Sequence, residues 1–393
     1  MTAEVPERQA VISGVGQSAA GRRLGRGGLD LTLEAVLAAL DDAGIDRKEV
    51  DGISCWPGVQ PGLPGFSPVS VGQLKDSLGL KLNWYNGGIE STQLSGVLNA
   101  CMAVASGQAR HVICFRTVTE TSVSAAARLP TTGSRVRVTG FMEHLAPFFA
   151  PSGANWVGMI ASRYFHEFGA KREQLAQIAL NARRNAGLNP RAVYRDPLTL
   201  DDYMQARMIS TPLCLYDCDV PIDGSIAVIV SHKDTVPDLK STPVRVEAMS
   251  GALHTRDSWD QLDDLTRFSA EAAGKRLWSR TDLKPSDVDV AQLYDGFSFL
   301  SLLWLEALGF CGRGEAADFV GDGRRISLEG DLPLATGGGQ LSGGRLHGMI
   351  HVAEAVIQLR GEGGARQVKG DPRVAVVSNG GGPIAGAMLL VRD

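Results

Sequence analysis

Three segments in the second half of the chain combine reactive side chains with glycine-rich backbone. They are Gln292-Leu-Tyr-Asp-Gly-Phe-Ser298, Gly337-Gly-Gly-Gln-Leu-Ser-Gly-Gly-Arg-Leu-His-Gly348 and Ser378-Asn-Gly-Gly-Gly-Pro-Ile-Ala-Gly386. The first offers a phenol that can transfer a proton, the second a permanent cation and an imidazole, and the third an amide beside three glycines. Such groups suit chemistry in which a proton moves and donors stabilise a negatively charged oxygen.

In their order and spacing these segments resemble the three active-site blocks of the thiolase superfamily, in its sterol-carrier-protein or lipid-transfer-protein branch. The resemblance implies a thiolase fold of the α/β class. This fold has two pseudo-symmetric βαβαβ halves in a five-layered α/β/α/β/α arrangement, with an inserted loop lobe over the active-site mouth. It also implies that Tyr294, Arg345 and Asn379 stand where a thiolase keeps its reactive residues.

The cysteine nucleophile of a thiolase is also missing from its expected place. The matching segment covers residues 87–100 and has Gln93 and Leu94 on either side of the expected position. The nearest cysteine, Cys101, lies about two helical turns further on, too far along a rigid helix to meet the same thioester. The nearby hydroxyl groups have no histidine in this segment to activate them. We therefore expect no covalent acyl-enzyme.

One reaction of acyl thioesters needs no nucleophile. In retro-aldol cleavage of a β-hydroxyacyl thioester, a base takes the β-hydroxyl proton, donors stabilise the enolate, and an acid protonates the α-carbon. Steroid side-chain aldolases of the same branch are similar to this chain in having tyrosine for the first-block histidine, as in Tyr294-Asp-Gly-Phe297.

The resemblance thus predicts a carbon–carbon lyase. Its substrate would be a β-hydroxyacyl-CoA with a bulky, steroid tail, and its products a ketone and a short acyl-CoA such as propionyl-CoA. A non-catalytic acyl-CoA or lipid-binding subunit and a condensing enzyme remain open as alternatives.

Four residues are the candidates for the catalytic work. Tyr294 is the first choice for proton transfer, followed directly by Asp295, although a core tyrosine is the alternative. Free tyrosine has a pKa of about 10, and the charge of Arg345 would lower it. Arg345 stands where the aldolases carry a second tyrosine, and it could also bind the thioester oxygen, meet a substrate carboxylate or pair with a structural carboxylate such as Asp295 or Glu90. His347 is a candidate acid or base, with a solvent- or core-facing histidine as the alternative.

A second group of residues is expected to bind the thioester and coenzyme A. Asn379 and the backbone amides of Gly380 and Gly381 are candidates for the thioester oxygen. Arg183 and Arg184 in the lobe are candidates for the coenzyme A phosphates, although a solvated helix face explains them equally well. Coenzyme A counts as part of the substrate, and we expect no cofactor and no metal bound by the chain itself.

An internal repeat indicates how the chain is organised. Gly44-Ile-Asp-Arg-Lys-Glu-Val-Asp51 aligns with Asp282-Leu-Lys-Pro-Ser-Asp-Val-Asp289 at an offset of 238 residues, and similar strand and helix patterns surround both. We predict a first half at residues 1–240, which includes the lobe at about 117–210, and a second half at residues 241–393.

Composition excludes several classes of protein. A net charge of −4 gives no basic footprint for nucleic acid, and no apolar run approaches the ~18 residues of a membrane span. Without a signal-like N-terminus, a cytoplasmic location is expected. The resemblance implies a homodimer formed through the first half, and a small companion protein with an OB-fold and a zinc ribbon.

Overall fold

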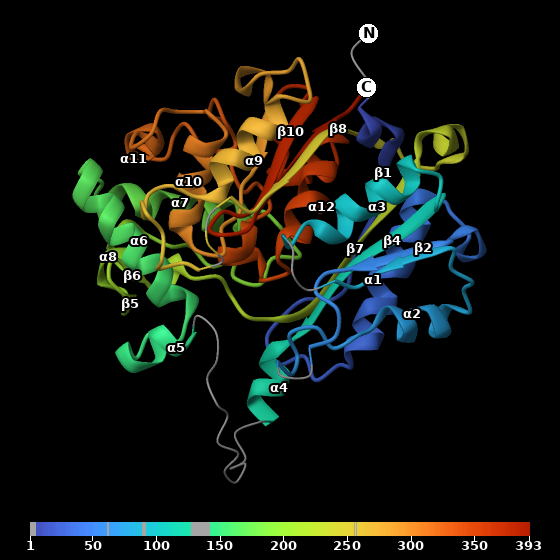
Figure 1. Cartoon of the computed structure of the whole chain (residues 1–393), viewed down its shortest axis with the longest axis horizontal. Coiled ribbons are helices and arrows are strands. Elements are labelled where there is room, and N and C mark those ends of the chain that lie inside the picture. The colour runs from blue at the N-terminus through green and yellow to red at the C-terminus, as the bar shows by residue number, and fades with distance from the viewer. Residues whose placement is uncertain (1–4, 61–62, 89–91, 127–141, 255, 257) are drawn as a thin grey trace.

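The computed structural model describes residues 5–60, 63–88, 92–126, 142–254, 256 and 258–393. Helices and strands alternate along the chain as the apolar patterns predict (Figure 1). The strands are β1 (Ala10–Gln17), β2 (Gly52–Cys55), β3 (Trp84–Asn86), β4 (His111–Thr119), β5 (Met208–Ser210), β6 (Leu213–Cys214), β7 (Asp223–His232), β8 (Val244–Ala252), β9 (Val290–Gln292), β10 (Val374–Gly380) and β11 (Ala385–Val391). The helices are α1 (Gly28–Ala43), α2 (Val71–Leu78), α3 (Ser95–Ala105), α4 (Glu120–Ala126), α5 (Met142–Leu145), α6 (Gly153–Phe168), α7 (Arg172–Gly187), α8 (Leu200–Gln205), α9 (Ser269–Trp278), α10 (Ser298–Ala307), α11 (Ala316–Val320) and α12 (Gly348–Leu359).

Two half-sheets form the centre of the molecule. Within the described residues they make one nine-stranded order, β3-β2-β4-β7-β1-β8-β11-β10-β9, and β5 pairs separately with β6. The halves join at β1 and β8 through two residue pairs, Val11 with Arg245 and Ile12 with Val244. Outward from this junction, β1-β7-β4-β2 correspond to β8-β11-β10-β9. The halves are therefore pseudo-symmetric, as the resemblance implies, although their sheets are continuous.

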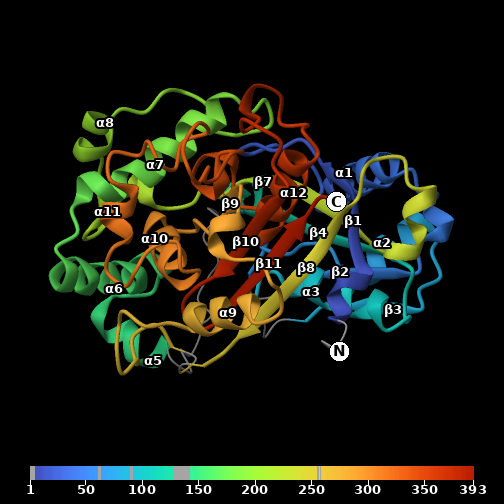
Figure 2. The same cartoon turned by 90° about the horizontal axis from the view of Figure 1, so that it is seen from above.

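Alternating apolar residues bring helices onto both faces of each half-sheet. In β7, Ile226, Val228 and Val230 face a core shared with α3 and α12. Ala227 and Ile229, between them, face α1. Strand β10 alternates in the same way between the shared core and a core that contains α9 and α10. The layers are thus α1 with α2, the first half-sheet, α3 with α12, the second half-sheet, and α9 with α10, which confirms the expected five-layered α/β fold (Figure 2).

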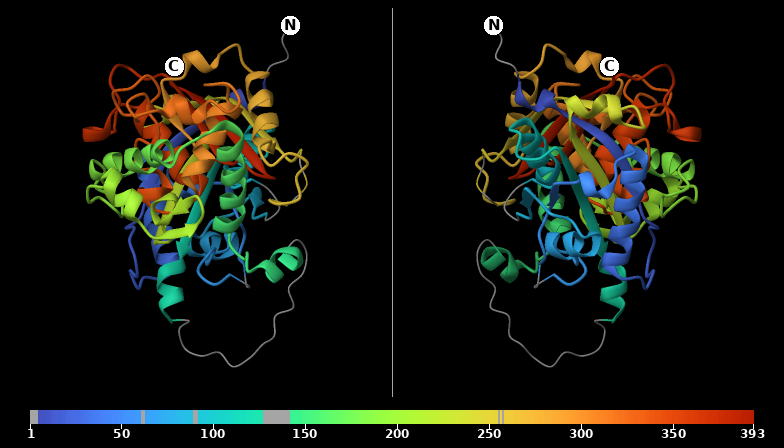
Figure 3. Two further views of the ribbon diagram at one scale, coloured as in Figure 1. Left: turned by 90° about the vertical axis from the view of Figure 1, so that its left-hand side faces the viewer. Right: turned by 90° about the vertical axis from the view of Figure 1, so that its right-hand side faces the viewer.

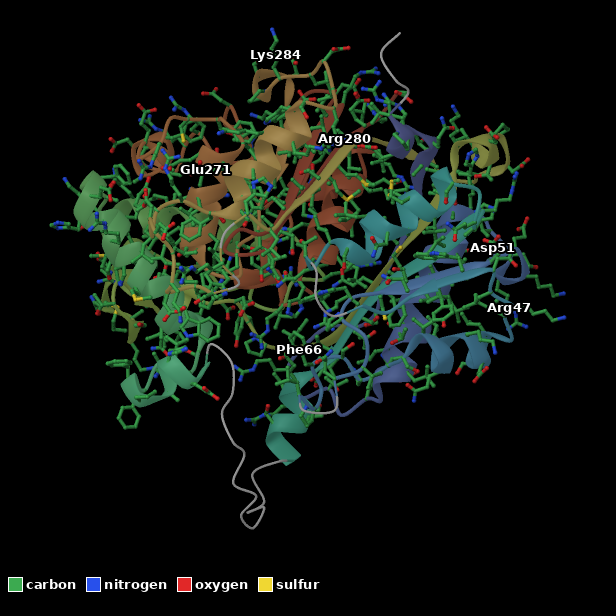
Figure 4. All side chains as sticks on the ribbon, in the orientation of Figure 1. Arg47, Asp51, Phe66, Glu271, Arg280 and Lys284 are labelled. Carbon is green, nitrogen blue, oxygen red and sulfur yellow. The ribbon has the colours of Figure 1, made fainter. Side chains whose placement is uncertain are left out.

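The repeated sequence segments form the same local structure in both halves. Each contains a short 3-10 turn, at residues 47–49 and 285–287. Asp51 then accepts hydrogen bonds from the backbone N–H groups of residues 110 and 111, where β4 begins, at 2.8 and 3.0 Å. Asp289 accepts equivalent bonds from residues 373 and 374, where β10 begins, at 2.7 and 2.9 Å. Figure 4 labels Asp51 in the first half and Lys284, just before the second turn. The offset of 238 residues therefore marks a structural duplication.

The inserted segment builds one side of the molecule. Helices α4 to α8 lie between β4 and β5 in the chain, and α6 and α7 pack beside α10 of the second half (Figure 3). Residues 127–141 of the predicted lobe lie outside the described residues. The division at residue 240 stays a prediction; that residue lies between β7 and β8. No helix in the described ranges has the length and apolar character needed to cross a membrane.

Candidate active site

Tyr294 lies where the two halves of the molecule meet. It follows β9, is 8% exposed, and its backbone N–H donates to Ser378 Oγ on β10 at 3.0 Å. Its hydroxyl accepts a hydrogen bond from Gln93 Nε2 at 2.9 Å, and Gln93 stands just before α3 of the first half. The first block, the third block and the segment that carries a thiolase's nucleophile therefore meet at Tyr294.

Gln93 lies beside the place where a nucleophile was expected, and its amide is fixed from both ends. Its Oε1 accepts from Asn379 Nδ2 at 2.6 Å, while Thr92 Oγ1 donates to Asn379 Oδ1 at 3.4 Å. This chain of bonds points Gln93 Nε2 at Tyr294. Cys101 is fully buried, and burial raises the pKa of its thiol. The segment therefore offers a hydrogen-bond donor in place of a thiolate.

Asp295 positions the glycine-rich second block. Its carboxylate accepts from the N–H groups of Gln340, at 2.9 and 3.0 Å, and of Leu341, at 3.3 Å. His351 Nε2 lies 3.2 Å from the same carboxylate. Gly339 has φ +55°, and a Cβ there would stand 1.9 Å from Asp295 Oδ2. Only glycine allows this close approach. Asp295 was predicted to take part in the catalytic work, and in the structure its carboxylate holds the backbone of the second block.

Arg345 is held between two carboxylates. Its guanidinium contacts Glu120 at 2.8 and 3.1 Å and Asp219 at 3.2 Å. Arg345 therefore pairs with structural carboxylates, as the alternative interpretation expected, but its partners are Glu120 and Asp219 rather than Asp295. The other expected partner, Glu90, lies outside the described residues. Burial opposes the charge of Arg345, but the two carboxylates outweigh it, so its pKa lies above the ordinary value.

Arg345 lowers the pKa of Tyr294, as expected, but the net shift of this pKa is upward. Burial raises this pKa, and the negative charge of Asp219 adds to it. The amides of Gln93 and Gln340 and the charge of Arg345 act in the opposite direction without cancelling the rise. Tyr294 is therefore a neutral phenol at physiological pH, suited to donating a hydrogen bond or a proton.

Asp219 is the titrating carboxylate of the site, and sequence reasoning missed it. Its side chain is 11% exposed. Burial, together with the charges of Glu120 and Asp295, raises its pKa to about 7 against the opposing effect of Arg345. A group with such a pKa can accept a proton at neutral pH. The sequence feature that could have indicated Asp219 is its position directly before the apolar residues 220–222. It lies in a segment that is typical of the lipid-transfer-protein branch.

His347 is not placed to titrate near neutral pH, contrary to its predicted acid or base role. It is 4% exposed and has φ +55° at the start of α12. Its Nδ1 accepts a hydrogen bond from Arg116 Nε at 3.1 Å. Burial, and then the positive charges of Arg116 and Arg345, hold the pKa of His347 well below its usual range. Arg116 is a second residue that sequence reasoning missed; its signal was a charge in a buried strand.

The third block forms a hairpin beside a pocket. The N–H of Gly381 already donates to Ile384 O at 3.1 Å, so it is not a free donor for an oxyanion. The carbonyl of Gly380 accepts from Trp304 Nε1 at 3.2 Å. Gly380 and Gln93 line a pocket of about 160 Å³ together with Trp56, Thr92, Trp259, Pro383 and Ile384. The amide of Gln93 and the hairpin of the third block therefore line the same pocket.

The two lobe arginines differ in their surroundings. Arg183 Nε donates to Ser342 Oγ of the second block at 3.0 Å, and its guanidinium stacks over Tyr194 and Tyr216 at 5.5 and 5.7 Å. Burial lowers the pKa of Arg183. Arg184 is exposed on the same helix. Their role with coenzyme A stays a prediction, and Arg183 contacts the glycine-rich second block through Ser342.

Comparisons with known proteins identify the family and the fold of the chain. Residues 251–392 match the family described as Thiolase C-terminal domain-like. The chain is 35% identical to a 17-hydroxy-3-oxo-4-pregnene-20-carboxyl-CoA lyase of Mycobacterium tuberculosis, over 97% of this chain and 99% of that one. It is also 35% identical to a steroid side-chain-cleaving aldolase of Thermomonospora curvata, over 97% of each. The solved structure of an Ltp2-ChsH2(DUF35) aldolase superposes with a TM-score of 0.87 at 33% identity, covering 98% of both chains.

Proposed function

Because the chain belongs to the thiolase superfamily, in the branch of the steroid side-chain-cleaving aldolases, we propose that it is a carbon–carbon lyase. It cleaves a β-hydroxyacyl-CoA with a steroid tail by a retro-aldol reaction. A 17-hydroxysteroid with a three-carbon CoA side chain would give a 17-ketosteroid and propionyl-CoA. The reaction breaks the bond between the α- and β-carbons and changes no oxidation state overall.

The observation that carries this proposal is the contact between Gln93 and Tyr294. A thiolase needs a thiolate at the start of this helix, because its reaction passes through an acyl-enzyme. Here the segment offers the carboxamide of Gln93, which donates to the phenol at 2.9 Å. Loss of the nucleophile and support of a tyrosine therefore occur together, as cleavage without a covalent intermediate requires.

Tyr294 and Asp219 are proposed to handle the β-hydroxyl proton. The phenol of Tyr294 would contact the β-oxygen, take its proton as the carbon–carbon bond breaks, and pass its own proton towards Asp219. A pKa of about 7 lets Asp219 hold that proton near neutral pH. The electron pair of the broken bond forms the enolate of the short acyl-CoA, whose α-carbon then takes up a proton.

The partners of the chain are proposed on separate grounds. The similar aldolase of known structure is named together with a second component, ChsH2(DUF35), and we propose for this chain a small companion with an OB-fold and a zinc ribbon. A homodimer is proposed through the first half-sheet, where β3 forms an edge and Tyr85 is 71% exposed. The CoA phosphates are proposed to meet Arg184 and Arg183, and the location is proposed to be cytoplasmic.

Product analysis tests the proposed function. The chain, co-expressed with its companion, is incubated with the CoA thioester of a 17-hydroxysteroid, and products are measured by liquid chromatography with mass spectrometry. Equimolar 17-ketosteroid and propionyl-CoA are expected. Tight binding of the thioester by calorimetry without cleavage would overturn the proposal in favour of a binding subunit.

A further inference from the structure

We propose that Arg116 and His347 form the oxyanion side of the site, in which His347 Nε2–H donates to the thioester enolate and Arg116 fixes the imidazole in that tautomer. His347 is then a catalytic residue and Arg116 a positioning residue. The inference rests on the proposed retro-aldol function and adds the group that stabilises the negative charge. It replaces Gly381, whose N–H is engaged in the hairpin.

Arg116 is a buried cation with an incomplete set of partners. It lies on β4 and is 1% exposed. Nε donates to His347 Nδ1 at 3.1 Å and Nη1 to Thr117 O at 3.2 Å. Nη2 has no hydrogen-bond partner among the described residues, although it is shielded from solvent. A buried charge is costly unless it is compensated, so this arrangement calls for a functional explanation.

The carboxylates near Arg116 are already engaged. Glu120 and Asp219 both contact Arg345, at 2.8 and 3.2 Å. Within the described part of the chain, Arg116 makes no ion pair of its own within 4 Å. Burial lowers the pKa of Arg116 to about 9, and the guanidinium stays charged at neutral pH. The site thus contains a fixed positive charge that an anion formed during the reaction can offset.

Two aromatic rings hold this pair in place. The guanidinium carbon of Arg116 lies 4.6 Å from the centre of the Phe66 ring and 5.7 Å from that of Trp56. His347 meets the same two rings edge-on, at 5.1 and 5.7 Å. Figure 4 labels Phe66, on the segment between β2 and α2. Cation–π contacts of this kind support a desolvated cation without neutralising it.

The hydrogen bond from Arg116 determines the tautomer of His347. Because Nδ1 accepts a hydrogen bond from the Nε–H of Arg116, a neutral His347 carries its own hydrogen on Nε2. The low pKa of His347 keeps the ring neutral. A neutral imidazole can donate a hydrogen bond to a developing oxyanion without giving up its proton, and a neighbouring cation strengthens that bond.

His347 lies beside the pocket described above, because its ring contacts Trp56, which lines that pocket together with Gln93. Gly348, the next residue, packs so closely that a Cβ would lie 2.7 Å from Asn379 Nδ2. Asn379 holds Gln93, which in turn holds Tyr294. One short run of contacts therefore separates the proposed enolate donor from the proposed β-oxygen side. A β-hydroxyacyl thioester presents two oxygens, and the two sides of the site would bind one each.

The test combines NMR spectroscopy with kinetics. The chain has seven histidines, so ¹⁵N-histidine labelling gives few signals, and the His347→Asn variant assigns the one of interest. We expect His347 to keep its hydrogen on Nε2 from pH 5.5 to 9, with Arg116 and Arg345 as the charges acting on it. In Arg116→Lys, the charge remains but the Nε donor is lost, so both tautomers should become visible.

The kinetic arm uses the complex with the companion. His347→Ala should lower kcat about 10²- to 10³-fold, the usual effect of losing one oxyanion donor, with KM nearly unchanged. Arg116→Lys should lower kcat less and also leave KM nearly unchanged. His166→Asn and Arg163→Lys, at exposed positions of α6, are matched controls, and circular dichroism checks that each variant folds.

Two results would overturn the inference: a hydrogen on Nδ1 of His347 in the wild-type protein, or His347→Ala with wild-type kcat. Failure of the proposed function looks different, because the wild-type protein would then not cleave the thioester at all. In that case His347 would have no enolate to stabilise, while the NMR spectrum would still show which nitrogen of His347 carries the hydrogen.

Discussion

At the scale of single residues, the site differs from a thiolase in what each position donates or accepts. The segment that carries a thiolase's nucleophile offers an amide, Gln93, which donates to the hydroxyl of Tyr294. Burial and Asp219 keep Tyr294 protonated, and the pKa of about 7 places the titrating group at Asp219. We therefore propose that the phenol contacts the substrate and that the carboxylate sets the pH dependence of cleavage.

Tyr294→Phe keeps the ring but removes the hydroxyl. We expect kcat to fall about 10²- to 10⁴-fold, the range for loss of a general acid–base group, while the dissociation constant for the thioester changes little. Turnover is measured by product analysis and binding by calorimetry. Tyr85→Phe, at an exposed tyrosine, is the control. Wild-type turnover in Tyr294→Phe would remove this residue from the mechanism.

The pH dependence of cleavage should follow Asp219. A base works only when ionised, so kcat/KM should rise as the pH rises through about 7 and then level off. Because the pKa of Tyr294 is raised, no loss of activity is expected from phenol ionisation at moderately alkaline pH. Asp219→Asn should be much slower, and its kcat/KM should no longer rise with pH around 7. Asp201→Asn, on the exposed face of α8, should keep that rise. If the rise persists in Asp219→Asn, another group is responsible for it.

At the scale of elements, the glycine loop of the second block is built around Asp295. The carboxylate accepts three backbone hydrogen bonds from residues 340 and 341, and Gly339 gives it room. The loop leads directly to Arg345 and His347. Its shape therefore determines where the cation and the imidazole stand.

Gly339→Ala tests the role of this loop. The added Cβ would overlap Asp295 Oδ2, and φ +55° is unfavourable for alanine. We expect a loss of more than about 1–3 kcal/mol in the free energy of unfolding, the cost of backbone strain alone, with a fall in turnover. Gly361→Ala is the control, because it has φ +76° with nothing within 4 Å of the new Cβ. Thermal unfolding that is equal in both variants would show that the close approach is unimportant.

Most of the elements were predictable, since apolar periodicity is a local property. The repeat at an offset of 238 residues correctly gave two related halves. Of the site, the convergence of Tyr294 with the third block followed from the resemblance.

The charge network of the site was not predictable in the same way. Arg345 meets Glu120 from 225 positions away, and Arg116 meets His347 from 231. Such pairs depend on how the strands and loops pack, and the net pKa of Tyr294 depends on burial as much as on charge. The only local signal for the importance of Arg116 was its charge within the buried strand β4.

At the scale of the whole molecule, the site exists only because two halves and the insertion meet. Gln93 comes from the first half, Tyr294 and Asn379 from the second, and Glu120 from the start of the insertion. The five-layered core holds α3 and α12 side by side in the shared layer. Each half alone would lack either the support of the phenol or the phenol itself.

The most direct test of cleavage without a nucleophile is to follow the reaction in D₂O with no added coenzyme A. The chain and its companion receive the 17-hydroxysteroid CoA thioester, and mass spectrometry analyses both the products and the intact protein. We predict equimolar 17-ketosteroid and propionyl-CoA, with one deuterium on the α-carbon and no acyl group on the protein. Products that appear only after coenzyme A is added, or an acylated chain, would contradict the retro-aldol mechanism.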